Sequence, residues 1–373
     1  MKAIINGRIV LENEVLDGGN IIFDEKIKRI SMDTDVSGCE TIDAKGAYVL
    51  PGFIDIHIHG YKGCDASDAN RDELLKMAEL LPENGVTAWC PTTMTVAAET
   101  IQKSLDIIDK LKNEKIKGAK ILGANVEGPF INPKKKGAQS EEFILPPDID
   151  FVLKNKNVIK LITLAPETDT DFSFTKEASK YVTVSVGHTD ADYETAKKAF
   201  ECGADHVTHL FNAMPPLAHR APGVIGAAFE NDGVFCEMIA DTFHIHPSLF
   251  KTVFKLKHEK LVLITDCMRA GGMPDGEYTL GGQKVTVKGI ECRLDDSTIA
   301  GSILTLNKAL YNFMSNVNLP IWQAAKAVSL SPAQSIGEAD MRGSLSEGKY
   351  ADIVIADDKI NIVKTFVQGD EVY

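Results

Sequence analysis

Residues 51–60 read PGFIDIHIHG, an apolar run that ends with two histidines, His57 and His59. Side chains two positions apart in a β-strand point to the same side, so both imidazoles are expected to face one point. At the C-terminal face of a parallel β/α barrel, such a pair can meet polar residues from other strand ends. Taken alone, the pair is also compatible with packed, hydrogen-bonded histidines. The segments that follow therefore decide whether it marks a metal site.

Apolar, strand-like segments recur along the chain and alternate with segments that look helical. Residues 66–85 and 189–204 are examples of the helical segments, with acidic residues in the first turn and glycine near the end. Eight strands are predicted, around residues 53–59, 87–90, 121–127, 158–164, 182–188, 206–210, 235–240 and 261–265. Eight is the number that closes a TIM-type (β/α)8 barrel, so the predicted class is α/β.

The two ends of the chain have a different sequence pattern from the middle. Residues 1–50 and 345–373 contain short strand-like runs, with Asn6-Gly7 and Gly18-Gly19 as turn signals. We expect these two ends to pair into one small β domain. The barrel is then expected to span residues 51–344, with a turn-rich β insertion near 274–296.

Composition excludes several classes of protein. With 40 basic and 53 acidic residues the net charge is −13, which argues against a general nucleic-acid or membrane-surface binder. An anionic substrate would have to be held by local basic groups. No apolar run is long enough to span a membrane, and the first ten residues lack the apolar region of a signal peptide. The seven scattered cysteines form no C-x-x-C pair and are expected to be reduced thiols, so a cytoplasmic protein is predicted.

Polar residues end several of the predicted strands. Because the C-terminal ends of barrel strands share one face, these residues are expected to meet there. A set of histidines and carboxylates suits Zn²⁺ or Fe²⁺, and an open position on such a metal lowers the pKa of bound water towards about 7. The chemistry predicted is hydrolytic. The residues concerned are His57, His59, Glu127, His188, His209 and Asp266.

Two residues, Asp266 from this set and Arg220, have both a functional and a structural interpretation. Asp266 ends the apolar run LVLITD; it could cap a helix or anchor a loop, or it could serve beside a metal-bound water as general base and then general acid. Arg220 lies on a proline-rich loop after the sixth strand. Its guanidinium suits bidentate contact with a phosphate, although an exposed loop arginine is the alternative.

Longer motifs carry a resemblance that covers nearly the whole chain. They are PGFIDIHIHG (51–60), EGPFINPKKKGAQ (127–139), VGHTDADYETAKKAFECGADHVTHLFNAMPP (186–216), ADTFHIHP (240–247) and LITDCMRAGGMPDGEYTLGG (263–282). With these motifs the chain resembles the N-acetylglucosamine-6-phosphate deacetylase family of the amidohydrolase superfamily. The resemblance implies a metal-bearing barrel, a β-sandwich domain formed by both termini, and usually a homodimer. It also implies release of acetate from N-acetylglucosamine 6-phosphate, in amino-sugar catabolism or cell-wall recycling. Deacetylation of N-acetylgalactosamine 6-phosphate or of another N-acyl compound remains the alternative.

The same resemblance implies roles for individual residues. Glu127, His188 and His209 match the principal metal ligands, and Asp266 matches the catalytic acid/base. His57 and His59 match ligands of a second metal, which some relatives lack, so one or two ions are expected. Residues that match the substrate site are Ala138, Gln139, Asn212, Ala213, Asp241, His244, Ile299, Ala300 and Gly301, with Arg220 as a phosphate ligand that can reach across the dimer.

The match departs from a well-known pattern at Gln139, where some relatives have histidine. An amide donor can still hydrogen-bond the acetyl oxygen of the substrate, but an imidazole role cannot be transferred to it. A catalytically inactive scaffold is a further alternative. The presence of all six metal and acid/base residues argues against it.

Overall fold

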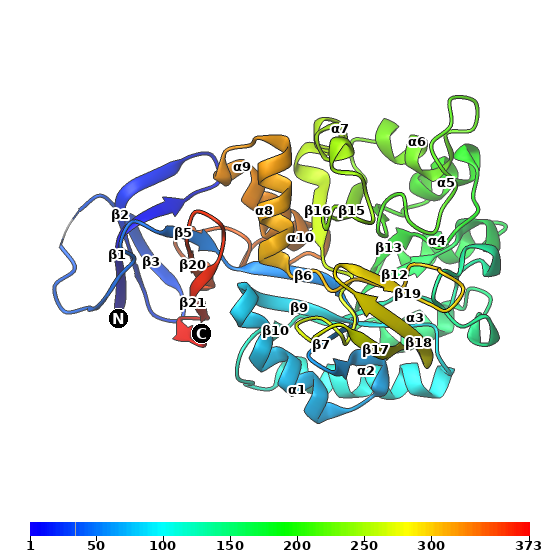
Figure 1. Cartoon of the computed structure of the whole chain (residues 1–373), viewed down its shortest axis with the longest axis horizontal. Coiled ribbons are helices and arrows are strands. Elements are labelled where there is room, and N and C mark those ends of the chain that lie inside the picture. The colour runs from blue at the N-terminus through cyan, green and yellow to red at the C-terminus, as the bar shows by residue number, and fades with distance from the viewer. Residues whose placement is uncertain (34) are drawn as a thin grey trace.

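The computed structural model describes residues 1–33 and 35–373. It has a small β lobe that contains both termini and a larger lobe of strands and helices (Figure 1). No helix within the described residues is long and apolar enough to cross a membrane.

Both ends of the chain build one hydrogen-bonded sheet in the small lobe. Its strands run in the order β22-β21-β20-β5-β1-β2-β3, and β4 also pairs with β1. The expected β domain formed by both termini is thus confirmed. The bounds are β1 (Lys2–Val10), β2 (Val15–Phe23), β3 (Ile27–Ser31), β4 (Glu40–Asp43), β5 (Tyr48–Pro51), β20 (Ile353–Ala356), β21 (Ile362–Val367) and β22 (Asp370–Glu371).

The two glycine-containing pairs expected as turns lie inside strands instead. Asn6-Gly7 falls within β1 and Gly18-Gly19 within β2, where Gly7 pairs with Gly19 and the register shifts on both sides of Gly7. Asn6 and Gly18 have positive φ angles of 56° and 76°. Positive φ at such residues accommodates a β-bulge as well as a turn, so the expectation of turns here is wrong although the local signal is real.

The larger lobe is the predicted barrel. Each strand pairs in parallel with the next in chain order, and the ring closes where the Asp266 N–H donates to the His57 carbonyl at 2.9 Å. The α/β fold class is confirmed. The strands are β6 (Phe53–Ile58), β9 (Val86–Thr93), β11 (Ala124–Val126), β12 (Ile159–Leu164), β13 (Thr183–Val186), β14 (His206–Val207), β15 (Phe235–Ile239) and β16 (Leu261–Ile264), and β10 (Lys120–Ile121) also pairs with β9.

Helices connect these strands and cover the barrel (Figure 1). Helix α1 begins after Asn70, whose side chain accepts a hydrogen bond from the Asp72 N–H, and α5 begins after Asp192, which caps the Thr195 N–H. The helices are α1 (Arg71–Leu80), α2 (Ala98–Asn113), α3 (Ile149–Asn155), α4 (Ser173–Ala178), α5 (Tyr193–Glu201), α6 (Gly223–Glu230), α7 (Phe250–Lys257), α8 (Leu306–Val317), α9 (Ile321–Ala325) and α10 (Leu330–Ser335).

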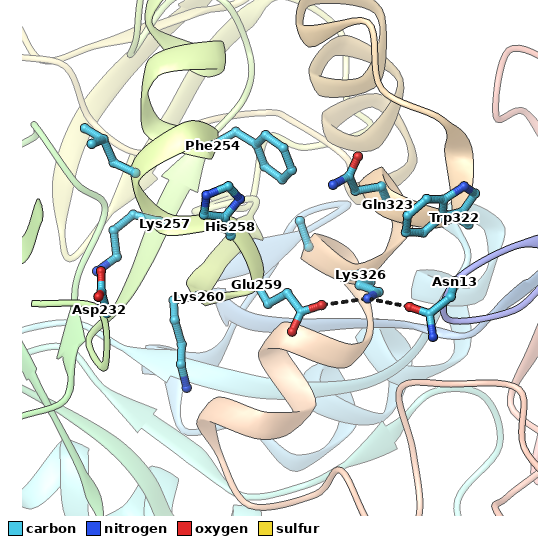
Figure 2. Close-up of a pocket in the computed structure, with 12 residues that line it drawn as sticks. Asn13, Asp232, Phe254, Lys257, His258, Glu259, Lys260, Trp322, Gln323 and Lys326 are labelled. Carbon is cyan, nitrogen blue, oxygen red and sulfur yellow. Dashed lines mark hydrogen bonds and ion pairs between the residues drawn. The ribbon is translucent and has the colours of Figure 1, made fainter.

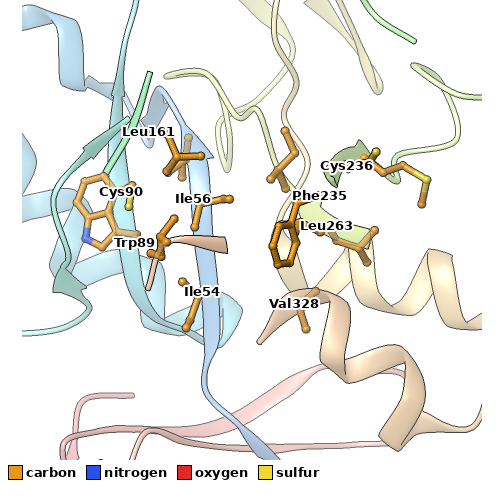
Figure 3. Close-up of a cluster of buried hydrophobic side chains, with 14 of the residues drawn as sticks. Ile54, Ile56, Trp89, Cys90, Leu161, Phe235, Cys236, Leu263 and Val328 are labelled. Atoms are coloured by element: carbon orange, nitrogen blue, oxygen red, sulfur yellow. The ribbon is translucent and has the colours of Figure 1, made fainter. Parts of the chain in front are cut away.

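The barrel strands are almost entirely buried, and their apolar side chains form the main core. Ile54, Trp89, Leu161 and Leu263 come from four different strands and are fully buried (Figure 3). Burial of such side chains is the main favourable term in folding, at about 1.5–3 kcal/mol for each large residue. The packed strands thereby hold the residues after their C-terminal ends in fixed positions.

Short β elements cover the C-terminal end of the barrel. The insertion expected near 274–296 is a three-stranded antiparallel sheet, β17 (Gly276–Leu280), β18 (Gln283–Lys288) and β19 (Glu291–Arg293). A hairpin of β7 (Gly60–Tyr61) and β8 (Cys64–Asp65) follows the first barrel strand. Leu280 and Val285 of the insertion pack with Met94, Ala138 and Met268 in a separate apolar cluster. The insertion is therefore fastened to the loops that follow the barrel strands.

Candidate active site

Six polar residues at or just after the C-terminal ends of five barrel strands meet at one point. All six are buried, and they form two groups within which the ligand atoms lie within 4.8 Å of one another. One group is His57, His59 and Asp266, and the other is Glu127, His188 and His209. The structure thus brings together the complete set of metal and acid/base residues that the sequence singles out.

Backbone geometry aims three of these side chains at the centre. His188, His209 and Asp266 have positive φ angles of 48°, 29° and 48°. Such angles are uncommon outside glycine, and they cluster at functional sites where the surrounding structure over-determines them. In each case the residue comes two positions after the end of its strand. The strand end therefore turns sharply, and the side chain is directed towards the barrel axis rather than away from it.

Glu127 lies between the two groups. Its Oε1 is 3.1 Å from His188 Nε2 and 3.0 Å from His209 Nε2, while its Oε2 is 3.2 Å from His59 Nε2. Its Oε1 is also 3.4 Å from His57 Nε2. One carboxylate thus contacts all four imidazoles, and it is placed to serve both groups.

The donor set fits a divalent cation. A tetrahedral ion with bonds of about 2.0–2.1 Å separates its ligand atoms by about 3.3 Å. His188 Nε2 and His209 Nε2 are 3.0 Å apart, and Asp266 Oδ1 is 3.2 Å from His59 Nε2. Buried His57 Nε2 has no hydrogen-bond partner within residues 1–33 and 35–373. A buried lone pair of this kind needs a partner, and a cation would supply one.

The ring orientations support the same interpretation. His59 Nδ1 donates to the Thr92 carbonyl at 3.1 Å, and His188 Nδ1 donates to the Lys135 carbonyl at 2.9 Å. Carbonyl oxygens only accept, so the proton of each neutral ring resides on Nδ1. The Nε2 lone pairs then face the centre of the site, which is the arrangement that metal-binding histidines require.

Electrostatics keep the carboxylates of the site ionised. Burial by itself would raise the pKa of Glu127, but the nearby His57 and His188 hold it well below its usual range. Burial would likewise raise the pKa of Asp266, and the hydrogen bond with His59 and the charge of His57 lower it. Burial lowers the pKa of His59, yet Asp266 and Glu127 raise it to about 10. The two carboxylates therefore stabilise a positive charge at this point, which a proton on His59 supplies and which a bound cation would supply in place of that proton.

Gln139 is fixed against the same carboxylate. Its Nε2 donates to Glu127 Oε2 at 2.6 Å, and its Oε1 accepts from the Thr95 N–H at 2.6 Å. The side chain is buried at the edge of the cavity described next. Because an amide nitrogen carries two hydrogens, one N–H remains for another acceptor.

A cavity of about 310 Å³ opens above the cluster. This volume lies in the usual range for small-molecule sites. Most of the residues expected to bind substrate line it, namely Ala138, Gln139, Asn212, Ala213, His244, Ile299 and Gly301, together with His59, Glu127, His188, His209 and Asp266. Five lining residues were not anticipated: Met94, Gly137, Phe211, Leu280 and Thr298.

Three expected substrate residues lie outside the cavity lining of the described chain. Asp241 is buried behind His244, and its carboxylate accepts from His244 Nδ1 at 2.6 Å, so it orients that ring. Ala300 is fully buried between two lining residues. Arg220 is exposed, and its guanidinium contacts the His219 ring at 2.9 Å.

The model of the amidohydrolase family matches residues 48–372, nearly the whole chain. The chain belongs to the amidohydrolase family. An N-acetylglucosamine-6-phosphate deacetylase of Bacillus subtilis is 40% identical over 374 residues, which covers 97% of this chain and 94% of the relative. An N-acetylgalactosamine-6-phosphate deacetylase of Escherichia coli O157:H7 is 34% identical and covers 86% of each chain.

Solved structures agree with the family assignment. A mutant N-acetyl-D-glucosamine-6-phosphate deacetylase from Mycobacterium smegmatis, in complex with N-acetyl-D-glucosamine-6-phosphate, superposes with a TM-score of 0.92. It is 27% identical, and the match covers 100% of this chain and 99% of that chain.

This amidohydrolase chain also has a larger cavity, of about 690 Å³, away from the cluster (Figure 2). Its lining includes residues that precede β16, at the opposite end of that strand from Asp266. Lys326 in this cavity is paired with Glu259 at 2.7 Å and lies 3.5 Å from Asn13 Oδ1. The N-terminal face of a barrel commonly serves stability, so size alone does not identify the active site.

Proposed function

We propose that the protein is a metal-dependent amide hydrolase that converts N-acetylglucosamine 6-phosphate to glucosamine 6-phosphate and acetate. The observation that carries this proposal is the buried cluster of four imidazoles and two carboxylates at the base of a cavity of about 310 Å³. The relative that is 40% identical over 97% of the chain supports the choice of substrate. The proposal includes a cytoplasmic homodimer that acts in amino-sugar catabolism or cell-wall recycling.

The cluster can hold one or two divalent cations, zinc or iron. Glu127, His188 and His209 would hold the first, and His57 and His59 would hold a second. A cation bound there supplies Lewis acidity, which lowers the pKa of water and polarises a carbonyl group. The remaining chemistry belongs to the side chains of the protein.

Asp266 is the acid/base residue in this proposal. Its carboxylate is ionised, lines the cavity and lies within reach of the same centre as His59. It accepts a proton from the attacking water and then transfers it to the departing amine, because an amine leaves from a tetrahedral intermediate more readily when protonated. Hydrogen bonds hold the backbone on both sides: the Asp266 N–H donates to His57, and the Asp266 carbonyl accepts from Ser302 at 2.8 Å.

Other residues orient the substrate. The remaining N–H of Gln139 would donate to the acetyl oxygen as negative charge develops there. Asn212 and His244 lie on the cavity wall and would contact the sugar. The exposed position of Arg220 is consistent with a phosphate contact made across the homodimer, because this side chain does not reach the cavity of its own subunit in the described structure.

The decisive experiment measures acetate release by enzyme of known metal content. Rapid release is expected from N-acetylglucosamine 6-phosphate and little from N-acetylglucosamine, because the phosphate provides binding energy. Absence of release from both compounds by metal-loaded protein would contradict the proposal. N-acetylgalactosamine 6-phosphate should be tested in parallel, since a relative that is 34% identical carries the name of that activity.

A further inference from the structure

Glu237 is a buried carboxylate that has no role in the chemistry described so far. It lies in the middle of β15, whose sequence is FCEMI, and is 1% exposed. Its neighbours in the strand, Cys236 and Met238, are apolar and fully buried. Burying an ionised carboxylate costs several kcal/mol unless partners compensate for the lost water. The partners of Glu237 therefore indicate what the residue does.

Glu237 contacts both groups of the metal cluster. Its Oε2 accepts from His57 Nδ1 at 2.9 Å and from the backbone N–H of His209 at 3.0 Å. Its Oε1 faces the buried His206 Nε2 at 3.3 Å. The carboxylate thus holds the ring of one expected metal ligand and the main chain of another, while His206 occupies its other side.

The contact with His57 differs in kind from those of the other rings. His59 and His188 donate from Nδ1 to neutral backbone carbonyls, of Thr92 and Lys135. His57 donates to a carboxylate. A carboxylate partner fixes the proton on Nδ1, leaves the Nε2 lone pair towards the metal and makes the imidazole a stronger donor. Among the described residues, His57 Nε2 is one of four buried histidine ring nitrogens that lack a hydrogen-bond partner, together with His209 Nδ1 and both nitrogens of His206.

We propose that Glu237 is a positioning residue that makes His57 a ligand for a second cation, so that two-ion occupancy depends on this carboxylate. The inference rests on the metal centre that is part of the proposed function. It deepens that proposal by naming the residue that decides between one and two ions. Glu237 would not touch substrate or the reacting atoms, and it acts through His57.

The test is a metal titration of the purified protein with Zn²⁺, with affinities determined by chelator competition and bound ions counted by mass spectrometry. Wild-type protein is expected to bind two ions per subunit. Glu237→Gln keeps the shape of the side chain and removes its charge. It is expected to retain the ion held by Glu127, His188 and His209 and to weaken the other about 10–100-fold.

A double-mutant comparison separates positioning from a general structural role. If Glu237 acts through His57, then Glu237→Gln has no further effect on zinc affinity in a His57→Asn protein. Glu237→Asp keeps the charge that faces His206 but draws the carboxylate away from His57, and the same loss of the second ion is expected. Thermal unfolding of each variant shows that the fold is kept.

Three results would overturn the inference. The first is a wild-type protein that binds a single ion. The second is a Glu237→Gln protein that binds both ions with wild-type affinity. The third is a further loss of zinc affinity when Glu237→Gln is added to the His57→Asn protein. None of these measurements uses substrate. A protein that binds two ions as described but releases no acetate would contradict the proposed substrate and leave the role of Glu237 intact.

Discussion

Replacement of Asp266 by asparagine isolates the proposed proton transfer. The amide has nearly the size of the carboxylate, and asparagine tolerates the φ of 48° found at this position. The fold is therefore expected to persist. The substituted side chain can no longer accept a proton, and it presents a neutral group where the carboxylate lies 3.2 Å from His59 Nε2 and 3.6 Å from His57 Nε2.

The expected loss follows from the role of the residue. A positioned acid/base group contributes about 10²- to 10⁴-fold to a rate, which corresponds to about 3–5 kcal/mol in the activation free energy. We expect kcat for acetate release from N-acetylglucosamine 6-phosphate to fall by that factor. KM should change little, because Asp266 faces the reacting group and not the phosphate.

The bound metal per subunit must be measured together with the kinetics. Asp266 Oδ1 lies close to the imidazoles of one candidate ion site, so the substitution could also change metal binding. Asp266→Asn protein is compared with wild type at equal bound metal per subunit. A variant that keeps its metal and fold and yet turns over at a near-normal kcat would refute the acid/base assignment.

Three other expectations can be checked with standard measurements. Arg220→Ala should raise KM for the phosphorylated sugar about 10–100-fold with kcat nearly unchanged, as expected for loss of a charge-assisted hydrogen bond, and an unchanged KM in steady-state kinetics would exclude the phosphate contact. Gly128→Ala should lower the free energy of unfolding by about 2–5 kcal/mol, because an added Cβ would lie 2.0 Å from Thr95 Oγ1 at a φ of +94°. Gly63→Ala, at a φ of +89° with open space around it, is the matched control for backbone strain, and equal losses in urea denaturation would contradict the steric explanation. Removal of metal with a chelator should abolish acetate release and lower the melting temperature, since an ion at 100 times its Kd stabilises the native state by about 2.7 kcal/mol, and full activity of metal-free protein would exclude the proposed chemistry.

Local sequence was sufficient for the barrel because its signals are repetitive and short-range. Apolar runs near residues 53–59 and 261–265 identified strands β6 and β16 without knowledge of their partners. The polar residue after each run was placed correctly on the common face, since all strands of a parallel barrel end at the same side. Asn6-Gly7 shows the limit of such signals, because one positive φ serves a turn or a bulge equally well.

Contacts within the site required the folded structure. Sequence indicated that Gln139 and Asp241 belong near substrate, but it contained no sign that Gln139 is bonded to Glu127 or that Asp241 stands behind His244. Arg220 was likewise expected as a phosphate ligand from its motif. Only the folded structure shows that its side chain lies outside the cavity lining and contacts His219 instead.

Sequence by itself determined which residue types follow each barrel strand, and with them the family and the kind of chemistry expected at one end of the barrel. Only the tertiary structure decided which atoms of those residues meet. His57 and Glu237 are separated by 180 positions in the sequence. The His57 Nδ1 and the Glu237 Oε2 lie 2.9 Å apart only because β6 and β15 belong to the same closed barrel. Strand periodicity is set by neighbouring residues, whereas the tautomer and direction of an imidazole are set by whichever group the fold brings to its other nitrogen.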